Sequence, residues 1–517
     1  MGRTVYLSLL TLLIWLAVNA SATTYYVAAN GNDANNGTSK TTPWLHAPGM
    51  TGCTGVCASA SPKPGDQFIL RGGDTWNYTN LPWTWNWSGA TNNRVYLGVD
   101  QSWYSGSAFA KPKLDGQFLC CTDGSGLLII AGGVSHITID NFEITGLMMV
   151  PPNGNSASIA LQNTTQGDVF MTNLYVHNWN RCTGAGKPSS ICTGAVTDNS
   201  WNAGGIQGSA WSNGPSMAGV IIDHSEVGDP ENGGNIGSAA HNIEQVNYSY
   251  IHDAGSGCKQ GCRIVHDSTF ANIGNTFDGS SHMDVIYADT FGAGSTAPSF
   301  QSYIYNNLIT GSTGNATNAI IYPNPYTSGA TSSVEFWIFN NVVYGGGNGI
   351  GDNIDPYNPG SATLTAKVHD WNNTYVSTSI NCVVLTGGAG RSAIDTLDVQ
   401  NLHCISPNAA VATNIGVTHL IQNNIVTQSS SQASAQGYTS SEFYAPTSST
   451  GSTVGAGVSL SAQCAGTLTA LCTGLSLYNP PTTGYPRPAA GVWDAGAYEF
   501  DSSSTTNPPS GLTDVVK

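Results

Sequence analysis

A short pattern of alternating apolar and polar positions recurs along the chain. Each copy has an apolar residue, a polar residue, an asparagine or another polar residue, two further residues and then, in most copies, Val, Ile or Phe. The copies are IDNFEI (139–144), MTNLYV (171–176), IDHSEV (222–227), VNYSYI (246–251), VHDSTF (265–270), YNNLI (305–309), FNNVV (339–343), WNNTYV (371–376), VQNLHC (399–404) and IQNNIV (421–426). Each reads as a strand that cannot bury its apolar side alone, so stacking of the copies predicts a solenoid with a ladder of polar side chains.

A second set of short apolar segments alternates with the first. Its members are SASIAL (156–161), AGGIQG (203–208), AHNIEQ (240–245), MDVIYA (283–288), TNAIIY (317–322), GNGIGD (347–352) and SINCVV (379–384). Apolar residues at helical spacing are not evident beyond the first 22 residues. Two or three strands per turn, joined by Gly and Asn corners, predict an all-β parallel β-helix. A propeller is the alternative, but its blades require more regular spacing.

Both ends of the chain carry motifs that resemble a known group of proteins. TTYYVAANGNDANNGTSKTTPW (23–44) and KPGDQFILRGGDTW (63–76) resemble the opening coils of secreted right-handed parallel β-helix proteins of the pectate-lyase-like superfamily. YPRPAAGVWDAGAYEF (485–500) resembles a closing motif of the same group. The resemblance implies a right-handed coil over roughly the whole chain. It does not select a reaction, because the group includes lyases, glycosidases, epimerases and proteins of no known activity.

Five regions are expected along the chain. Residues 1–22 have an early arginine, an apolar run and Ala-Ser-Ala, which is typical of a secretory signal peptide. We assign 23–125 to a capped N-terminal end with the first coils, and 126–428 to the parallel β-helix. Residues 429–500 form an irregular, Ser/Thr-rich segment with the closing motif, and 501–517 lack an apolar pattern and are expected to be disordered.

Charge and cysteine content narrow the possible partners and the compartment. Only 9% of residues are charged and the formal net charge is −16, so no basic surface is expected for nucleic acid or an anionic membrane. The twelve cysteines fall into six pairs of short spacing: Cys53/Cys57, Cys120/Cys121, Cys182/Cys192, Cys258/Cys262, Cys382/Cys404 and Cys464/Cys472. In an exported chain these are read as disulfides. Zinc is the alternative at CKQGC, which His252 and His266 flank.

The segment GSSHMDVIYADTF (279–291) surrounds a short apolar strand with one histidine and two aspartates. We align Ile286 with Ile206, Ile243, Ile320 and Ile350 as an interior stack, which turns Gln207, Glu244, Tyr287, Asp289 and Ile321 outward. His282 and Asp284 fall at the preceding corner. Asp284 fits a turn cap as well as a reactive site, whereas His282 is a candidate for proton transfer.

Distances limit which carboxylates can work as a pair. Asp284 and Asp289 would lie about 16 Å apart along one strand at about 3.3 Å per residue. A glycosidase pair needs about 5 to 9.5 Å, which residues on adjacent coils can provide. The expected hydrolase pairs are therefore Glu244 with Tyr287 or Asp289, and Asp289 with Asp352 or Asp355.

A polysaccharide lyase needs a base and a positive charge that neutralises the uronate carboxylate of its substrate. The candidate catalytic residues are His282, Tyr287, Lys259 and Arg263. The candidate Ca²⁺ ligands are Glu244, Asp284, Asp289 and Asp352. Lys259 and Arg263 also flank CKQGC, where a disulfide-braced surface turn is the structural alternative.

Aromatic residues suggest a place for sugar binding. Trp83, Trp85 and Trp87 alternate in LPWTWNWSG and share one strand face. If exposed they would form a stacking platform, to which we add Tyr322; if buried they would close the N-terminal end of the solenoid.

These observations predict an extracellular, monomeric protein that acts on a polysaccharide. Ca²⁺-assisted β-elimination of a uronic-acid-containing glycan is the first reading. A glycoside hydrolase on the same fold is the second, and a non-catalytic, adhesive glycan-binding protein is the third.

Overall fold

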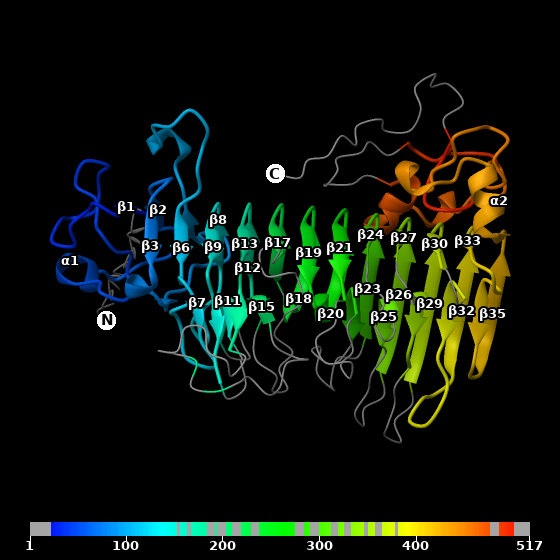
Figure 1. The fold of residues 1–517 in the computed structure, drawn as a ribbon, viewed down its shortest axis with the longest axis horizontal. Coiled ribbons are helices and arrows are strands. Elements are labelled where there is room, and N and C mark those ends of the chain that lie inside the picture. The colour runs from blue at the N-terminus through cyan, green and yellow to red at the C-terminus, as the bar shows by residue number, and fades with distance from the viewer. Residues whose placement is uncertain are drawn as a thin grey trace, which may run out of the picture.

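The structure is a computed structural model, and its strands stack into a long coil (Figure 1). It describes residues 22–151, 156–162, 167–182, 192, 194, 203–208, 219–228, 237–274, 284–289, 299–311, 319–324, 332–345, 350–356, 364–377, 381–475 and 485–500. The expected signal peptide and the tail after residue 500 lie outside these ranges. No helix of the described part is long and apolar enough to cross a membrane.

Each full turn of the coil contributes strands to three faces, and all pairings between named strands of the described residues are parallel. A 22-stranded sheet holds the first two faces and a 12-stranded sheet holds the third. This arrangement is a parallel β-helix, which confirms the predicted fold class.

We call the face on which each turn of the coil begins the first face. Its strands are β4 (Trp83–Trp85), β7 (Gly126–Ile130), β11 (Ala157–Leu161), β15 (Ala203–Gln207), β22 (Ile286–Asp289), β25 (Ala319–Asn324), β28 (Ile350–Ile354), β31 (Val383–Leu385) and β34 (Val411–Thr413). Two long strands, β18 (Ser238–Asn247) and β20 (Ser256–His266), run through both the first and second faces and join them.

The second face is next along each turn. Its strands are β1 (Thr24–Val27), β2 (Gln67–Leu70), β5 (Val95–Gly98), β8 (Ile137–Asp140), β12 (Val169–Thr172), β16 (Val220–Asp223), β23 (Ser299–Tyr305), β26 (Ser332–Phe339), β29 (Leu364–Trp371), β32 (Ile394–Gln400) and β35 (Val417–Asn423).

The third face is the separate 12-stranded sheet. It comprises β3 (Thr75–Asn77), β6 (Lys113–Asp115), β9 (Glu143–Thr145), β13 (Tyr175–His177), β17 (Glu226–Gly228), β19 (Tyr250–Ala254), β21 (Thr269–Ile273), β24 (Leu308–Thr310), β27 (Val342–Tyr344), β30 (Thr374–Val376), β33 (His403–Ile405) and β36 (Val426–Gln428). A short pair, β10 (Met148–Met149) with β14 (Asn180–Arg181), extends it locally.

The recurring polar pattern marks the corner between the second and third faces. The third position of six of the ten copies has a positive φ: Asn141, Asn173, His224, Tyr248, Asp267 and Asn401. In three other copies the second position takes this conformation: Asn306, Asn340 and Asn372. In the last copy the fourth position, Asn424, takes this role. Asparagine tolerates the left-handed conformation better than most residues, which explains its recurrence at a sharp turn.

Polar side chains next to this corner form the predicted ladder inside the coil. The amide Nδ2 of Asn307 donates to Oδ1 of Asn341 at 3.0 Å, and Nδ2 of Asn341 donates to Oδ1 of Asn373 at 3.1 Å. All three side chains are fully buried. Because each amide also bonds backbone groups of the neighbouring turn, the ladder fixes the register of the coils.

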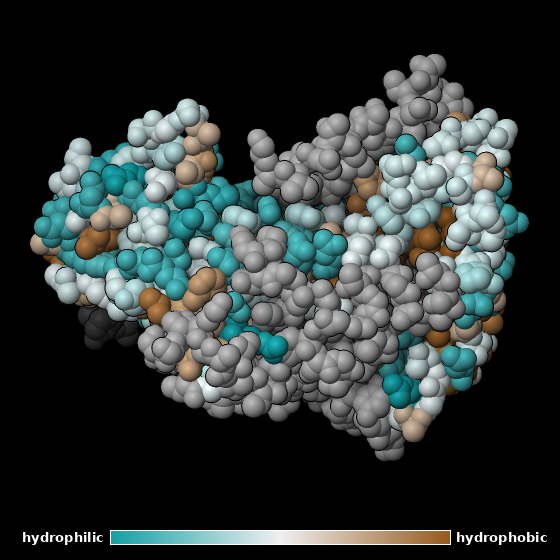
Figure 2. Space-filling view, in the orientation of Figure 1, coloured by the Kyte–Doolittle hydropathy of each residue, from teal (hydrophilic) through white to brown (hydrophobic). Residues whose placement is uncertain are grey.

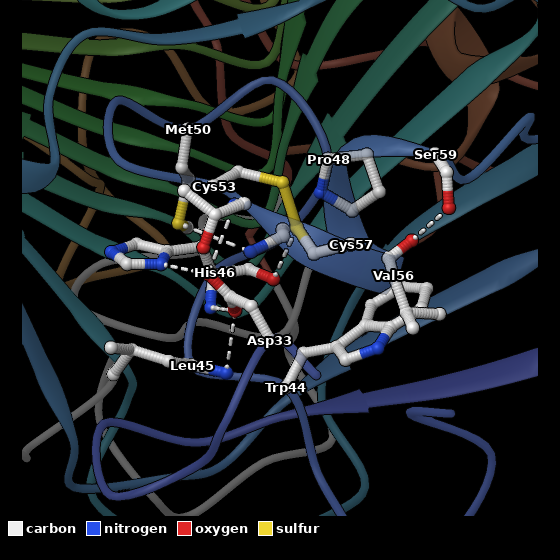
Figure 3. Close-up of a disulfide and its surroundings, with 12 residues drawn as sticks. Asp33, Trp44, Leu45, His46, Pro48, Met50, Cys53, Val56, Cys57 and Ser59 are labelled. Atoms are coloured by element: carbon white, nitrogen blue, oxygen red, sulfur yellow. Dashed lines mark hydrogen bonds and ion pairs between the residues drawn. A yellow bond between two sulfur atoms is a disulfide. The ribbon is translucent and has the colours of Figure 1, made fainter. Parts of the chain in front are cut away.

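The N-terminal end is closed by a compact segment around α1 (Gly55–Ala58), held by a disulfide between Cys53 and Cys57 (Figure 3). One carboxylate organises this segment. Oδ1 of Asp33 accepts the N–H groups of Leu45 and His46, and Oδ2 lies 2.7 Å from Nδ1 of His46.

The tryptophans of the first coils belong to this closure. Trp83 and Trp85 are fully buried, and Trp87 is half-buried against Trp85 with ring centroids 4.9 Å apart. Trp83 and Trp85 therefore cannot form a sugar platform, and that prediction is wrong for them. The open end of a solenoid exposes apolar area, which explains why these rings are packed inside.

All six predicted cysteine pairs form disulfides. The pair in CKQGC is not the expected surface turn. Cys258 and Cys262 both lie in the core of the coil, at the corner within β20 where the chain passes from the first to the second face.

The C-terminal segment folds back over the coil, as Figure 1 shows for the chain around α2 (Ser430–Ala435). Its Phe443, Leu475 and Ala497 pack against Leu308 and Val342 on the outer side of the third face. Its Leu460, Leu471 and Trp493 pack against aromatic side chains on the outer side of the second face: Tyr305, Phe339 and Trp371.

Candidate functional site

Outward-facing polar side chains form a continuous row on the middle turns of the first face. Gln207 of β15 pairs with His241 of β18, which pairs with Lys259 of β20. The pairing of Cys258 with Ile286 places Tyr287 of β22 next to Lys259. Neighbouring strands lie about 4.8 Å apart, so Lys259 has His241 on one side and Tyr287 on the other.

The alternation of the strands explains why this row faces outward. Ala240, Cys258 and Ile286 point into the core of the coil. Their successors in sequence therefore point away from it. Exposure to solvent differs along the row. His241 and Lys259 in the middle are fully buried, whereas Gln207 and Tyr287 at the ends are half-buried.

His241 is a neutral base in this setting. Its Nε2 lies 3.0 Å from Oε1 of Gln260, so Nε2 carries the hydrogen and donates it. Its Nδ1 has no hydrogen-bond partner. Burial, helped by the positive charge of Lys259, lowers the pKa of His241 to about 4. The lone pair of Nδ1 is therefore available at neutral pH, one strand away from a lysine.

Sequence reasoning did not select His241, although it lies in the AHNIEQ segment. Its place next to Lys259 depends on the pairing of two long strands, which no local pattern indicates. One signal in the sequence could have found it. His241 is a histidine at an outward position of its strand, and Lys259 lies on the next turn of the coil.

The other predicted catalytic residues are distributed differently. His282 lies outside the described residues. Arg263 forms an ion pair with Glu244, with 3.0 Å between Nη1 and Oε1, and its Nε donates to the carbonyl oxygen of Gln301 at 2.9 Å. An arginine held in this way is not a base, because its guanidinium keeps its proton. Of the four predicted catalytic residues, the structure brings together Lys259 and Tyr287.

The predicted Ca²⁺ ligands do not form a site in the described residues. The carboxylate of Glu244 is already bound by Arg263 and by the N–H of Gly219. Asp284 is fully buried at the corner before β22, and the side chain of Asp289 lies outside the described part. No group of three or more His, Cys, Asp or Glu side chains in the described part is arranged to hold a metal ion.

Asp352 was expected outside the coil and lies inside it. Ile321, not Ile320, aligns with Ile286, and Asp352 aligns with Ile321. Asp352 lies two residues after Ile350, which was expected in the interior stack, so the alternation of the strand already points Asp352 inward. The one-residue register error concerns Ile321, which was expected to face outward and lies in the core. Burial, followed by the nearby carboxyl of Asp370, raises the pKa of Asp352 well above its usual value.

Two candidates remain: Asp355, for a carboxylate pair, and Tyr322, for sugar binding. Both carboxylate oxygens of Asp355 are bound by Arg391 at 2.8 Å, so Asp355 is not a free partner for Asp289. Tyr322 pairs with Tyr287 on the next turn of the first face, and its side chain lies outside the described part.

Comparisons with known proteins find only distant similarity. No family model matches the chain, and no curated protein matches it in sequence. Pectate lyase Pel9A is 13% identical, with a TM-score of 0.38, over 93% of this chain and 97% of that one. A GH136 lacto-N-biosidase from Eubacterium ramulus is 14% identical, with a TM-score of 0.38, over 79% and 68%. An alginate lyase from Paenibacillus sp. str. FPU-7 is 13% identical, with a TM-score of 0.27, over 68% and 92%. The class of this protein, a parallel β-helix, rests on its own strand pairing.

Proposed function

We propose that this protein is an extracellular carbohydrate-active enzyme that cleaves a uronic-acid-containing polysaccharide by β-elimination on the first face. The observation that carries the proposal is the row His241, Lys259 and Tyr287 on three consecutive turns. It combines an imidazole lone pair without a partner, a positive charge and a phenol within reach of one sugar residue.

Each side chain has a distinct role in this reaction. The ammonium group of Lys259 neutralises the uronate carboxylate, which makes the proton on the neighbouring carbon more acidic. Nδ1 of His241 accepts that proton, and the electron pair forms the new double bond as the bond to the glycosidic oxygen breaks. Tyr287, on the opposite side of Lys259, donates a proton to the leaving oxygen. Because His241 and Lys259 are buried, their cover must open for the glycan to react.

Two of the four Ca²⁺ ligands expected from the sequence are engaged elsewhere, since Glu244 is paired with Arg263 and Asp352 faces the core. Lys259 provides the positive charge in place of the metal. We therefore expect turnover to persist after treatment with a chelator.

The test is to incubate the purified protein with polygalacturonate, alginate and neutral glycans, with and without EDTA. Ultraviolet absorbance of the new double bond is the expected result. New reducing ends without that absorbance would identify a glycoside hydrolase instead. Binding of a glycan without cleavage would identify an adhesive protein and overturn the proposed reaction.

A further inference from the structure

The third face has an open stretch between two raised parts of the molecule. The connection between β5 and β6, residues 99–112, rises on one side and the C-terminal segment on the other (Figure 1). The surface between them is hydrophilic and lower than its flanks (Figure 2). We call the outward side of β6, β9, β13, β17 and β19 the saddle.

Two rows of side chains form the saddle. Strand register places Lys113, Glu143, Tyr175, Glu226 and Tyr250 side by side on five consecutive turns. The second row, two residues further along each strand, contains His177 and His252. The first row thus alternates carboxylate and phenol about every 4.8 Å along the axis of the coil.

The saddle contains the same arrangement twice. The ring of Tyr175 stacks on that of His177 at 3.9 Å, and Nε2 of His177 lies 3.2 Å from Oε1 of Glu143 on the preceding turn. Tyr250 stacks on His252 at 4.1 Å, and Nε2 of His252 lies 3.3 Å from Oε1 of Glu226.

The residue beside the histidine differs between the two copies. A Cβ atom on Gly228 would come within 2.6 Å of the His252 ring in its present position. The first copy has Thr145 at the equivalent place beside His177.

The charges of these groups are fixed by their neighbours. Burial opposes ionisation of Glu143, but hydrogen bonds from His177 and Lys113 outweigh it and lower its pKa. Burial likewise opposes the charged form of His252, but bonds to Asp253 and Glu226 raise its pKa. Burial raises the pKa of Tyr250 to about 12, which keeps its hydroxyl protonated.

We propose that the saddle is a binding site for a neutral, hydroxyl-rich glycan that runs along the axis of the coil. Fixed carboxylates accept hydrogen bonds from sugar hydroxyls, and tyrosine hydroxyls donate or accept them. The two copies lie two turns apart, a spacing of about 10 Å that matches successive pairs of sugar residues in an extended chain. Glu143, Glu226 and Asp253 repel polyuronates, which distinguishes this ligand from the substrate of the first face.

The saddle is a binding surface and not a second hydrolytic centre. Glu143 is held ionised by Lys113, at 2.6 Å, and by His177, so it cannot donate a proton to a glycosidic oxygen. The inference does not depend on the reaction proposed for the first face, because glycan binding is measured without turnover.

Affinity electrophoresis in native gels that contain glucomannan, hydroxyethyl cellulose or polygalacturonate tests the inference. We expect at least one neutral polymer, and not polygalacturonate, to retard the protein. Tyr250→Ala and Tyr175→Ala should weaken that retardation at least fivefold. Tyr248→Ala is the matched control, because Tyr248 is 38% exposed at the corner before β19, belongs to neither row of the saddle and stacks on His224.

Glu226→Gln provides a second variant that keeps the shape of the side chain, and it should also weaken retardation. Circular dichroism confirms that each variant is folded. Absence of retardation by both neutral polymers would overturn the inference, as would retardation that survives all three saddle substitutions. Cleavage of a neutral polymer that disappears in Glu226→Gln would replace a binding role with a catalytic one.

Discussion

At the scale of single residues, the strands that form the wall of the coil separate two pairs of buried titratable groups, one on the outer side and one on the inner side. Lys259 and His241 lie on its outer side, next to each other on the first face. Asp352 and Asp370 lie on its inner side, where Oδ2 of Asp370 accepts a hydrogen bond from Tyr375 at 3.1 Å. The outer pair is the one to which we assign a role in the proposed reaction, whereas we expect the inner pair to affect the stability of the fold.

Removal of the positive charge from the outer row should abolish most of the elimination. Lys259→Met keeps the length of the side chain and removes the group that we propose neutralises the uronate. We expect the initial rate of double-bond formation to fall about 100-fold or more, the range that a positioned charged group contributes. Lys367→Met, on the outer side of the second face, is the matched control and should keep wild-type activity. An unchanged rate in Lys259→Met would exclude Lys259 from the site.

The inner carboxyl pair should make stability fall as the pH rises. Burial is the main cause that raises the pKa values of Asp352 and Asp370 above those in the unfolded chain. The folded state therefore holds protons that the unfolded state loses above about pH 4, so the free energy of unfolding decreases through the weakly acidic range and beyond. Asp352→Asn should remove much of this decrease, because it removes one of the two groups whose pKa burial raises. Thermal unfolding of both proteins from pH 4 to pH 8 measures it, and parallel curves would contradict the assignment.

At the scale of elements, the amide ladder connects the turns more specifically than apolar packing does. Asn341 accepts hydrogen bonds from the backbone N–H and the amide of Asn307, and it donates to Asn373 and to the carbonyl oxygen of Ile304. Each of these groups is fully buried, so none can bond to water instead. The ladder thereby fixes which residue of one turn lies beside which residue of the next.

Asn341→Ala should destabilise the coil by about 2 to 4 kcal/mol, because it leaves several buried donors and acceptors unsatisfied. Urea unfolding provides the measurement. Asn86→Ala is the control, since Asn86 is exposed and bonds only to the nearby carbonyl of Thr84 at 3.2 Å. Equal midpoints for the two variants would show that the ladder contributes no more than a surface amide.

At the scale of the whole molecule, a single arginine fastens the C-terminal segment onto the coil. Arg487 is fully buried and bonds to Glu499 at 3.0 Å, to the carbonyl oxygen of Gly496 at 2.8 Å and to Oδ1 of Asn340 at 3.3 Å. Asn340 lies at a corner of the coil, so this cluster joins the closing motif to the repeat.

Arg487→Met should release the segment and expose the aromatic side chains beneath it. Loss of one partner from a buried ion pair costs about 3 to 5 kcal/mol. We expect limited proteolysis to cut within residues 429–500 of the variant much faster than in the wild type. Arg71→Met, which breaks a partly exposed pair with Asp74, should cost about 1 kcal/mol or less and leave proteolysis unchanged. Equal proteolysis of both variants would mean that apolar contacts alone hold the segment.

The sequence by itself determined the fold class, the repeating corner and the disulfides. These features depend on local signals: a strand pattern that needs partners, asparagine at a positive φ, and cysteines close enough to pair within one or two turns. Lys259 and Tyr287 could also be selected as chemically suitable residues, although nothing local placed them side by side.

Only the tertiary structure decided which side of the wall each candidate faces and which residues meet across turns. Connections of unequal length leave the register of the first face open, and a shift of one residue moved Ile321 from its expected outward position to the core. The same register brought His241 beside Lys259, and end packing buried Trp83 and Trp85. The physical reason is that side-chain direction alternates along a strand, so the chemistry of each face depends on pairings between residues far apart in the chain.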